Sequence, residues 1–430
     1  MILIEATIPG AANNPRRISN QSIALTNFWE PLVTEFNPPQ FRIAKSYGGY
    51  SQLSFGGISF NIEMFDDDAT WPPPRTVALV FKHTTTTQEA AIELFRATGY
   101  LSSFGLSQVQ YDLFGTQHTE KSLDTTTNFN NETDIPVPMV LGHVDYVVPL
   151  RVPDVNTAPT YHKAGITSNF MVFDDGVDIT ANATTNADGT FSLSAVPVGE
   201  VTMSGDSTIN SIDALLSWGA GRLSLSYTNT NIGTSIPINA YVVQQGLVVD
   251  LLSEVSSFAC KLFYIANGNE LVAVGMSENN GTPIPLNTFQ FQSSDIVYEK
   301  PIKQINTSWE VPTAGEQRDG GKLVRREVVD LSVESEYTYG QEINVESFYQ
   351  FGTNIKATNE ARLNAILELI HTPRLNLRYP LSEGLPLPGQ QISITDTNKI
   401  RQITTLIRAR NLQYDFRSEF VIVGGEGTLT

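Results

Sequence analysis

Short strands joined by tight glycine turns constrain the fold of this 430-residue chain more than any other feature. The segment CKLFYIANGNELVAV reads as two strands joined at Asn267-Gly268, because two-residue hairpin turns need residues that tolerate positive φ. Asp175-Gly176 and Asp188-Gly189 repeat this signal between strand-like segments. The spacing predicts three hairpins and a mainly β fold.

Further strands are predicted where apolar and β-branched residues alternate or run together, at residues 75–83, 137–152, 169–180 and 419–430. Near the end of the chain, SEGLPLPGQQISITD places Pro386 and Pro388 before Gly389 and an alternating Ile-Ser-Ile segment. Proline denies N–H groups to a sheet and glycine permits a sharp turn. We therefore expect a barrel corner that leads into a strand.

Helices are few, and three are predicted, at residues 84–99, 247–258 and 357–373. The first would begin at a threonine cap, bury Phe95 and its apolar neighbours, and stop at Gly99. The third repeats leucine and isoleucine at helical spacing, with Thr358 or Asn359 as its cap. These helices are expected to pack on β-domains.

The length predicts more than one domain, since about 100 to 200 residues per domain gives two to four. The order of elements divides the chain into a β-rich barrel-like domain with one helix at 1–125, a β domain with hairpin turns at 126–210, a small α/β helix-hairpin module at 211–285, and a second barrel-like β domain with one long helix at 286–430. The first and last units share one recipe of strands, a single helix, then strands.

The charge balance excludes one class of function. With 45 acidic and 27 basic residues the formal net charge is −18, so a surface that neutralises phosphates, and with it sequence-specific nucleic-acid binding, is not expected. Cys260, the one cysteine, lies in an apolar run and is expected to be a buried structural thiol. The start MILIEATIPG lacks a basic signal region and no run approaches the ~20 apolar residues of a membrane helix, so we expect a soluble protein without stable membrane insertion.

No catalytic constellation emerges from the sequence. Five histidines stand singly, without the spacing of a zinc site: His83, His118, His143, His162 and His371. No G-x-S-x-G motif supports a serine hydrolase. In GEQRDGGKL, which mimics a phosphate loop, Lys322 comes one residue late and Leu323 replaces the Mg²⁺-binding hydroxyl residue, so a hairpin loop is expected. We expect no enzyme, no cofactor and no metal.

Two acidic segments keep other functions open. Residues 66–68, all aspartate, precede Trp71 and three prolines, and a solvated loop pinned by Trp71 is the simpler interpretation. Asp174-Asp175 and Asp178 lie at a hairpin turn, where aspartate is favoured for local reasons. A carbohydrate-binding receptor protein, with Trp29 and Trp71 as its aromatic residues, stays open, as does a glycosidase that uses the acids of the loop.

The order of modules after residue 170 is the most specific feature of the chain. The turn-rich GTFSLSAVPVGEVTMSGDS is followed by the helix-hairpin LLSEVSSFACKLFYIANGNELVAV and by SSDIVYEKPIKQINTSWEVP. The helix TNEARLNAILELI, the strand RLNLRYP, the turn LPLPGQQISITD and the closing strands IRQITTLIRARNLQYDFRSEFVIVGGEG complete the series. This order resembles the hub proteins at the tail tip or baseplate of tailed bacteriophages, over most of residues 170–430.

The resemblance implies a structural virion protein, a homotrimer whose two β-barrel units per chain form a pseudo-sixfold ring. That ring would extend the tail tube and contact distal tail, tape-measure and fibre or tip proteins. It would leave a lumen for DNA, which an acidic wall would not bind. Assembly in the host cytoplasm and a place at the phage tail tip follow from the same resemblance.

Proteins of this class differ in whether they carry a lytic extension and in how many chains form their ring. Hubs that carry a C-terminal peptidase or lysozyme-like extension differ from this sequence, so lytic activity is not expected. A hexameric distal tail adaptor ring is the alternative to the trimeric hub.

Overall fold

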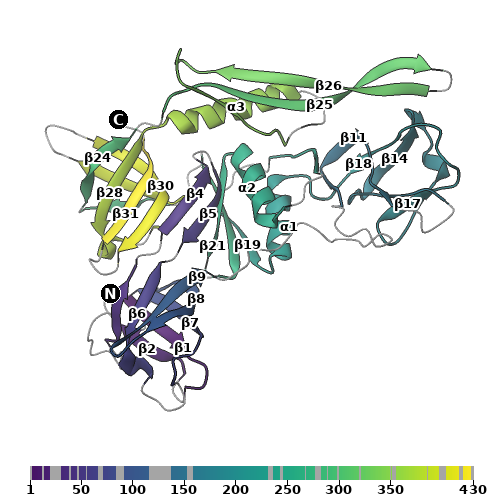
Figure 1. Ribbon diagram of the computed structural model, residues 1–430. Coiled ribbons are helices and arrows are strands. Elements are labelled where there is room, and N and C mark those ends of the chain that lie inside the picture. Colours follow the sequence, from purple (N-terminus) through teal and green to yellow (C-terminus); the bar gives the residue numbers. More distant parts are fainter. Residues whose placement is uncertain are drawn as a thin grey trace.

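The computed structural model describes residues 2–11, 14–19, 31–37, 40–45, 48–54, 56–65, 71–83, 92–115, 137–152, 158–230, 236–242, 246–266, 268–276, 282–287, 289–297, 300–318, 321–348, 350, 355–384, 386–396, 403–415 and 420–427. Within these ranges strands predominate, and the α-helices are α1 (Ile212–Arg222), α2 (Val248–Phe258) and α3 (Ile355–His371). The predicted β-rich fold with several sheets and a few packing helices is confirmed (Figure 1).

Seven antiparallel strands from the start of the chain form the first sheet, in the order β2 (Arg16–Ser19), β1 (Ile2–Thr7), β7 (Thr76–His83), β8 (Ile92–Phe104), β9 (Gln108–Gly115), β6 (Gly57–Asn61) and β3 (Val33–Phe36). A 3-10 turn, η1 (Ile62–Phe65), follows β6. Along β9 buried and exposed residues alternate without interruption, which is the pattern of a sheet with one face on a core. We call these strands the N-terminal sheet.

Eleven strands drawn from both halves of the chain form a second, nearly closed sheet, the large sheet. Its main path is β19 (Ser226–Thr230), β22 (Glu270–Gly275), β21 (Lys261–Ala266), β5 (Gly48–Ser54), β4 (Gln40–Lys45), β30 (Ile403–Asp415), β31 (Phe420–Gly427), β28 (Arg374–Pro380) and β24 (Gln290–Val297). β29 (Gln391–Asp396) joins β30, and β23 (Ile284–Leu286) joins β29. The sheet thus unites residues on both sides of positions 125, 210 and 285, and the division into four domains stays a prediction.

One contiguous cluster of buried hydrophobic residues runs through the N-terminal sheet and the large sheet. It contains Phe60, Phe81 and Tyr111 from the first and Tyr379 and Tyr414 from the second, all at most 4% exposed. Residues near the two ends of the chain therefore belong to one hydrophobic cluster. We call this the shared core.

A second core holds the three helices together. α1 packs on α2, where Leu252 lies against Gly219, and the face of α2 that carries Ser253 and Ser257 packs on β5. α3 contributes Leu363, Ile366 and Ile370, the residues whose helical spacing the sequence displays. The predicted helices at 247–258 and 357–373 are therefore confirmed.

A long ribbon covers α3. It consists of β25 (Ile302–Arg318) and β26 (Gly321–Glu334), with β27 (Gln341–Asn344) parallel to the root of β25. Figure 1 shows the ribbon passing along α3 and continuing beyond that helix. We call it the arm. The expected hairpin loop of GEQRDGGKL is the end of this arm, since Arg318 pairs with Gly321.

The appended β domain projects from the helical part of the molecule (Figure 1). Its two four-stranded sheets are β11 (His143–Val147), β18 (Val201–Asp206), β14 (Ser168–Asp174) and β15 (Val177–Asp178), and β12 (Arg151–Val152), β13 (Thr160–His162), β17 (Thr190–Leu193) and β16 (Ala183–Thr185). η3 (Thr180–Asn182) precedes β16. At its base, β10 (Met139–Leu141) pairs with β20 (Ala240–Val242).

The three predicted hairpins are present. β14 and β15 meet at Asp175-Gly176, with φ of 48° and 80°, and β16 and β17 meet across a loop that contains Gly189 at φ 81°. β21 and β22 meet at Gly268, φ 69°. Residues 386–391 form the expected corner: Gly389 has φ 81° and donates its N–H to the Ala409 carbonyl at 2.7 Å, and η4 (Leu381–Glu383) precedes the turn.

The predicted helix at 84–99 is wrong over its described part, because residues from Ile92 onward belong to β8. Phe95, Ala97 and Gly99 are buried and Arg96 and Tyr100 are exposed, which is a period of two. Pairing with β7 and β9 on both sides satisfies the backbone of this segment and outweighs its helical propensity.

The expected caps of the long helix are also wrong. α3 begins at Ile355, so Thr358 and Asn359 lie inside its first turns. Asn359 is fully buried, and its Oδ1 accepts a hydrogen bond from the Ser347 hydroxyl at 2.9 Å. A polar residue that resembles a cap in sequence therefore ties the helix to the segment after β27.

Candidate functional site

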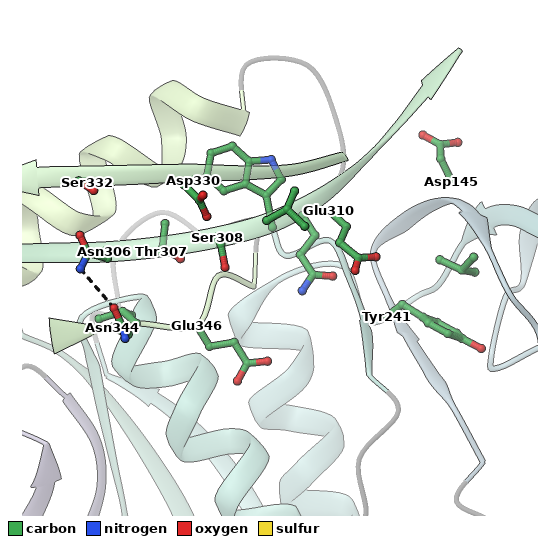
Figure 2. A pocket seen from close by; sticks show the side chains of 15 residues that line it. Asp145, Tyr241, Asn306, Thr307, Ser308, Glu310, Asp330, Ser332, Asn344 and Glu346 are labelled. Carbon is green, nitrogen blue, oxygen red and sulfur yellow. Dashed lines mark hydrogen bonds between the residues drawn. The ribbon is translucent and has the colours of Figure 1, made fainter. Parts of the chain in front are cut away.

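A polar cleft of about 1130 Å³ lies at the root of the arm. Three segments that are distant in sequence form its walls: the arm, the segment after β27, and the base of the appended β domain. Figure 2 shows their side chains around the opening, with Ser308 and Asp330 on the arm, Glu346 after β27, and Asp145 and Tyr241 on the third wall.

Strand alternation makes the arm polar on the side of the cleft. Ile305 and Trp309 are buried in the core with α3, whereas Ser308 and Glu310 are exposed. On β26, Leu331 is buried and Asp330, opposite Ser308, is exposed. Because successive side chains of a strand point to opposite faces, the same two strands supply both the core over α3 and the polar wall.

Carboxylates dominate the charge of the cleft. Asp145, Glu310, Asp330 and Glu346 line it, and none of the described residues that line it is Lys, Arg or His. Burial raises the pKa of Glu346, the negative charge of Glu254 raises it further, and Lys45 acts in the opposite direction. The site therefore carries an excess of negative charge.

Contacts between the walls fix the shape of the cleft. Asn306 Nδ2 donates to Asn344 Oδ1 at 3.3 Å across β25 and β27 (Figure 2). Behind Glu346, Lys45 Nζ lies 2.5 Å from Glu254 Oε2, a bond between β4 and α2. The first contact joins the arm to β27, and the second joins the large sheet to α2.

His143 lies beside the cleft, where the chain enters the appended β domain. Its Nδ1 is 2.6 Å from Asp206 Oδ1 and its Nε2 is 3.1 Å from Asp145 Oδ2, so both ring nitrogens face carboxylates. Asn169 Nδ2 donates to the other oxygen of Asp206 at 2.5 Å. Burial opposes protonation of His143, but the hydrogen bond to Asp206 and the charge of Asp145 outweigh it and raise the pKa. An imidazolium, with two donors, fits this arrangement.

The aspartates of the acidic hairpin, Asp174, Asp175 and Asp178, accept hydrogen bonds from nearby backbone N–H groups. The Asp174 carboxylate accepts the backbone N–H groups of Val198 at 2.8 Å and Gly199 at 2.7 Å. Asp175 accepts the N–H of Glu200, and Asp178 accepts the N–H of Thr180, both at 2.9 Å. These bonds hold a turn together, as the simpler interpretation predicts.

The other residues singled out by the sequence do not converge. His162 is buried in the appended β domain, and His371 Nε2 accepts the N–H of Ile302 at 3.3 Å. Cys260 is buried, as predicted. Residues 66–68, Trp29 and His118 lie outside the described residues, as does the side chain of His83.

Two further features are absent from the described residues. No cluster of three or more His, Cys, Asp or Glu side chains there could hold a metal ion. None of the helices in that part of the chain is both long enough and apolar enough to cross a membrane.

Two exposed aromatic pairs, which together we call the aromatic patch, lie at β8 and β9, far from the cleft in sequence. Trp71 packs edge-on against Phe104 with ring centroids 6.0 Å apart, and Tyr100 packs edge-on against Phe114 at 5.2 Å. Each of these four side chains is more than 40% exposed. Trp71 therefore pins its segment against β8, and the patch offers aromatic rings to solvent.

Sequence reasoning missed the cleft. Asp145, Glu310 and Glu346 belong to three segments, and nothing in their spacing brings them together. A partial signal exists in INTSWEV, residues 305–311, where buried and exposed residues alternate, and it indicates a strand with one polar face. What that face meets is decided by the rest of the fold.

Comparisons with known proteins were made for the whole chain. No protein-family model matches it, and no curated protein matches it. A 43 kDa tail protein of prophage MuSo2 from Shewanella oneidensis aligns with a TM-score of 0.45 at 8% identity, over 99% of this chain and 97% of that one. A tail protein from Neisseria meningitidis MC58 aligns with a TM-score of 0.35 at 9% identity, over 70% of this chain and 95% of that one. A chain of the virion of a native gene transfer agent particle aligns with a TM-score of 0.41 at 8% identity, over 68% and 84%.

The first two of these structural neighbours are tail proteins, the class that the order of modules in the sequence resembles. At such low identities, and with TM-scores below 0.5, the likenesses assign neither a family nor a role to this chain.

Proposed function

We propose that this chain is a non-enzymatic structural subunit of a phage tail tip or baseplate, a hub that extends the tail tube. The order of modules after residue 170 motivates the proposal. The observation that carries it is the shared core, in which a sheet from the start of the chain and a sheet that holds its end pack as one body. A chain with two large β units can occupy two positions of a pseudo-sixfold ring, so three chains would close it.

The remaining features fit a subunit that is completed by neighbours. The arm and the appended β domain project from the body (Figure 1), and both add surface beyond what the two cores need. The negative charge of the chain suits the wall of a channel through which DNA passes without binding. Contacts with tail-tube, tape-measure and fibre proteins belong to this proposal.

The number of chains in the ring tests the proposal. The full-length protein, 47.3 kDa per chain, should give a three-chain species in native mass spectrometry and three-lobed rings in electron microscopy. Rings of six chains would instead favour the distal tail adaptor and remove the hub.

A carbohydrate-binding receptor protein is the second candidate, and the exposed aromatic patch favours it. Exposed aromatic rings can stack on apolar faces of a ligand, and Tyr100 and Phe114 form such an exposed pair. Binding to a glycan array that Trp71→Ala and Tyr100→Ala abolish would support this candidate. An array without any signal would remove it.

The glycosidase is the weakest alternative. Replacement of Asp67 and Asp68 by asparagine in the phage should leave infectivity unchanged if the chain has no hydrolytic role. A loss of infectivity that accompanies a loss of glycan cleavage by the purified protein would support the enzyme.

A further inference from the structure

We propose that His143 is a proton-controlled clamp at the neck of the appended β domain. The neck is the point where β11 enters this domain at His143 and β18 leaves it at Asp206. The protonated imidazole holds the two strands together. Without that proton the neck opens, and the domain gains freedom to change its angle to the rest of the molecule. This inference goes beyond the proposed function and does not depend on the ring.

Three segments of the chain meet at the neck. His143 begins β11 and pairs with Asp206, the last residue of β18. The backbone N–H of His143 donates to Asn239 Oδ1 at 3.0 Å. Asn239 in turn donates its own N–H to the carbonyl of Phe348, in the segment after β27, at 3.1 Å. His143 therefore lies where the appended β domain is joined to the rest of the molecule.

The backbone pairing at the neck is short. β11 and β18 pair at His143 with Asp206 and at Val144 with Gly205, and the register then shifts before Val147. A segment with few paired residues opens more readily than a long, regular ladder. Side-chain contacts between the two strands therefore matter for keeping the neck closed.

The imidazole of His143 supplies such contacts from both of its nitrogens. Its Nδ1 lies 2.6 Å from Asp206 Oδ1 on the other strand, and its Nε2 lies 3.1 Å from Asp145 Oδ2 on β11. Only an imidazolium donates from both nitrogens, whereas a neutral ring turns a lone pair toward one of the carboxylates. Loss of the proton thus replaces one hydrogen bond by repulsion, and two negative charges then flank an uncharged ring.

The charged groups that face the ring, among the described residues, are Asp145 on β11 and Asp206 on β18. Neighbouring elements contribute neutral groups, since Asn169 on β14 donates to Asp206 Oδ2 at 2.5 Å and Asn239 contacts the His143 backbone. Burial opposes protonation of His143, but the two carboxylates outweigh it and raise the pKa above 6.5. The clamp is therefore closed below pH 6.5 and opens as pH rises through the raised pKa.

The ring, and not the carboxylate beside it, takes up the proton. Burial acts to raise the pKa of Asp206, but the hydrogen bonds from Asn169 and His143 outweigh it and lower the pKa. A cavity of about 680 Å³ opens beside His143 and Asp206, and its other lining residues are uncharged. The His143 side chain is 41% exposed, so it exchanges protons with the surrounding solvent.

Hydrogen exchange of the full-length chain tests the clamp. The Gly142 N–H donates to the Ile209 carbonyl and the Ser207 N–H to the Gly142 carbonyl, both at 2.8 Å, so these two amides report on the neck. After correction for the intrinsic pH dependence of exchange, their protection should fall at least about fivefold between pH 6 and pH 9. Protection that stays constant over this range overturns the clamp.

Two substitutions should change this profile in opposite directions. In Asp145→Asn the new amide can donate to Nε2 of a neutral ring while Nδ1–H still donates to Asp206, so the neck should stay protected at both pH values. In His143→Gln one side-chain amide replaces two ring nitrogens on opposite sides, so protection should be low at both. A pH dependence that persists in His143→Gln, or that Asp145→Asn leaves unchanged, overturns the clamp.

His162→Gln is the matched control, because His162 belongs to the same domain but not to the neck. This variant should keep the wild-type exchange profile at Gly142 and Ser207. If it also removes the pH dependence, the proton acts elsewhere in the domain and the clamp is overturned. Asp145→Asn is expected to keep the neck closed, so the test stays decisive even where His143→Gln fails to fold.

A distance measurement shows whether an open neck frees the domain. Spin labels on Thr184→Cys in β16 and Glu360→Cys in α3 occupy exposed positions, whereas the native Cys260 is buried. The distance distribution from pulsed electron paramagnetic resonance should be narrower at pH 6 than at pH 9, and broad at both values in His143→Gln. Identical distributions at the two pH values overturn the proposed freedom of the domain, even where the neck amides respond.

Discussion

The shared core and the core of the appended β domain are built in opposite ways. Phe81 and Tyr379 of the shared core lie almost 300 positions apart in the sequence, whereas the buried residues of the appended domain's core run from Val140 to Met203, with Tyr241 packed against them. The first combines strands from both ends of the chain, whereas the second combines strands within residues 143–206, where β18 pairs with β11 and β14. We therefore expect the part of the molecule that contains the shared core to unfold as one cooperative unit, and the appended β domain to unfold separately.

The largest expected effect is a loss of stability in the part of the molecule that contains the shared core. Phe81→Ala removes a fully buried ring that stacks on Phe36 at 5.2 Å and on Phe95 at 4.5 Å, and should cost about 3–5 kcal/mol of unfolding free energy. Hydrogen exchange should then rise together in β7 and in β28. If only the N-terminal sheet loses protection, the two sheets do not share one core energetically.

The corresponding change in the appended β domain should stay local. Phe191→Ala removes a fully buried ring that packs on Tyr161 at 5.3 Å and Phe170 at 5.1 Å, with a cost of about 3 kcal/mol. Protection against hydrogen exchange should fall over residues 143–206 and persist in the large sheet. Loss of protection in β28 and β31 would contradict the independence of the two cores.

The junction between the two regions should be the next most sensitive point. Gly142 has φ 61°, and an added Cβ would lie 1.9 Å from the Ile238 carbonyl oxygen, so Gly142→Ala should cost about 1–3 kcal/mol from backbone strain, plus the displacement of β20. Gly165 is the matched control, because its φ is 83° and open space surrounds its Cβ position. In thermal unfolding, Gly142→Ala should lose more stability than Gly165→Ala. Equal losses in the two variants would show that the clash at Gly142 is relieved without cost.

The smallest effect is a pH dependence that distinguishes two histidines of the appended region. The raised pKa of His143 means that its stabilising contribution is fully present below pH 6.5 and is lost as pH rises through the folded-state pKa. His143→Gln should therefore destabilise the chain more at pH 6 than at pH 8, by less than about 1 kcal/mol because the ring is partly exposed and screened.

His162 should behave in the opposite sense. Burial lowers its pKa, so the folded state resists its protonation and stability is lost as pH falls below 6.5. Urea unfolding of His162→Gln at the two pH values should show a relative gain at the lower pH. A pH profile of His143→Gln that matches the wild type would contradict the role of the Asp145 and Asp206 contacts.

Local signals in the sequence account for much of the fold. Asp175-Gly176 and Gly268 have the positive φ that their hairpins require, and Gly389 turns the corner after Pro386 and Pro388. The apolar spacing of Leu363 and Ile366 was sufficient for α3. Each of these features depends on residues within a few positions of one another.

Where the sequence misled, a distant partner decided the structure. Phe95 lies in a segment with helical composition, but this segment forms the strand β8 because it pairs with β7 and β9. Asn359 has the side chain of a cap, and Ser347 makes it an interior contact of α3 instead. Propensities differ by fractions of a kilocalorie per residue, so sheet pairing overrides them.

The β-rich class, the hairpins, two of the helices and the excess of negative charge follow from the sequence alone. The tertiary structure alone decided that strands from both ends share a core, and that Asp145, Glu310 and Glu346 surround one cleft at the root of the arm. Turns and helices follow from short-range sterics and hydrogen bonds, which sequence spacing records. A cleft between segments more than 150 residues apart depends on which faces the packing leaves uncovered, and that is settled only when the whole chain has folded.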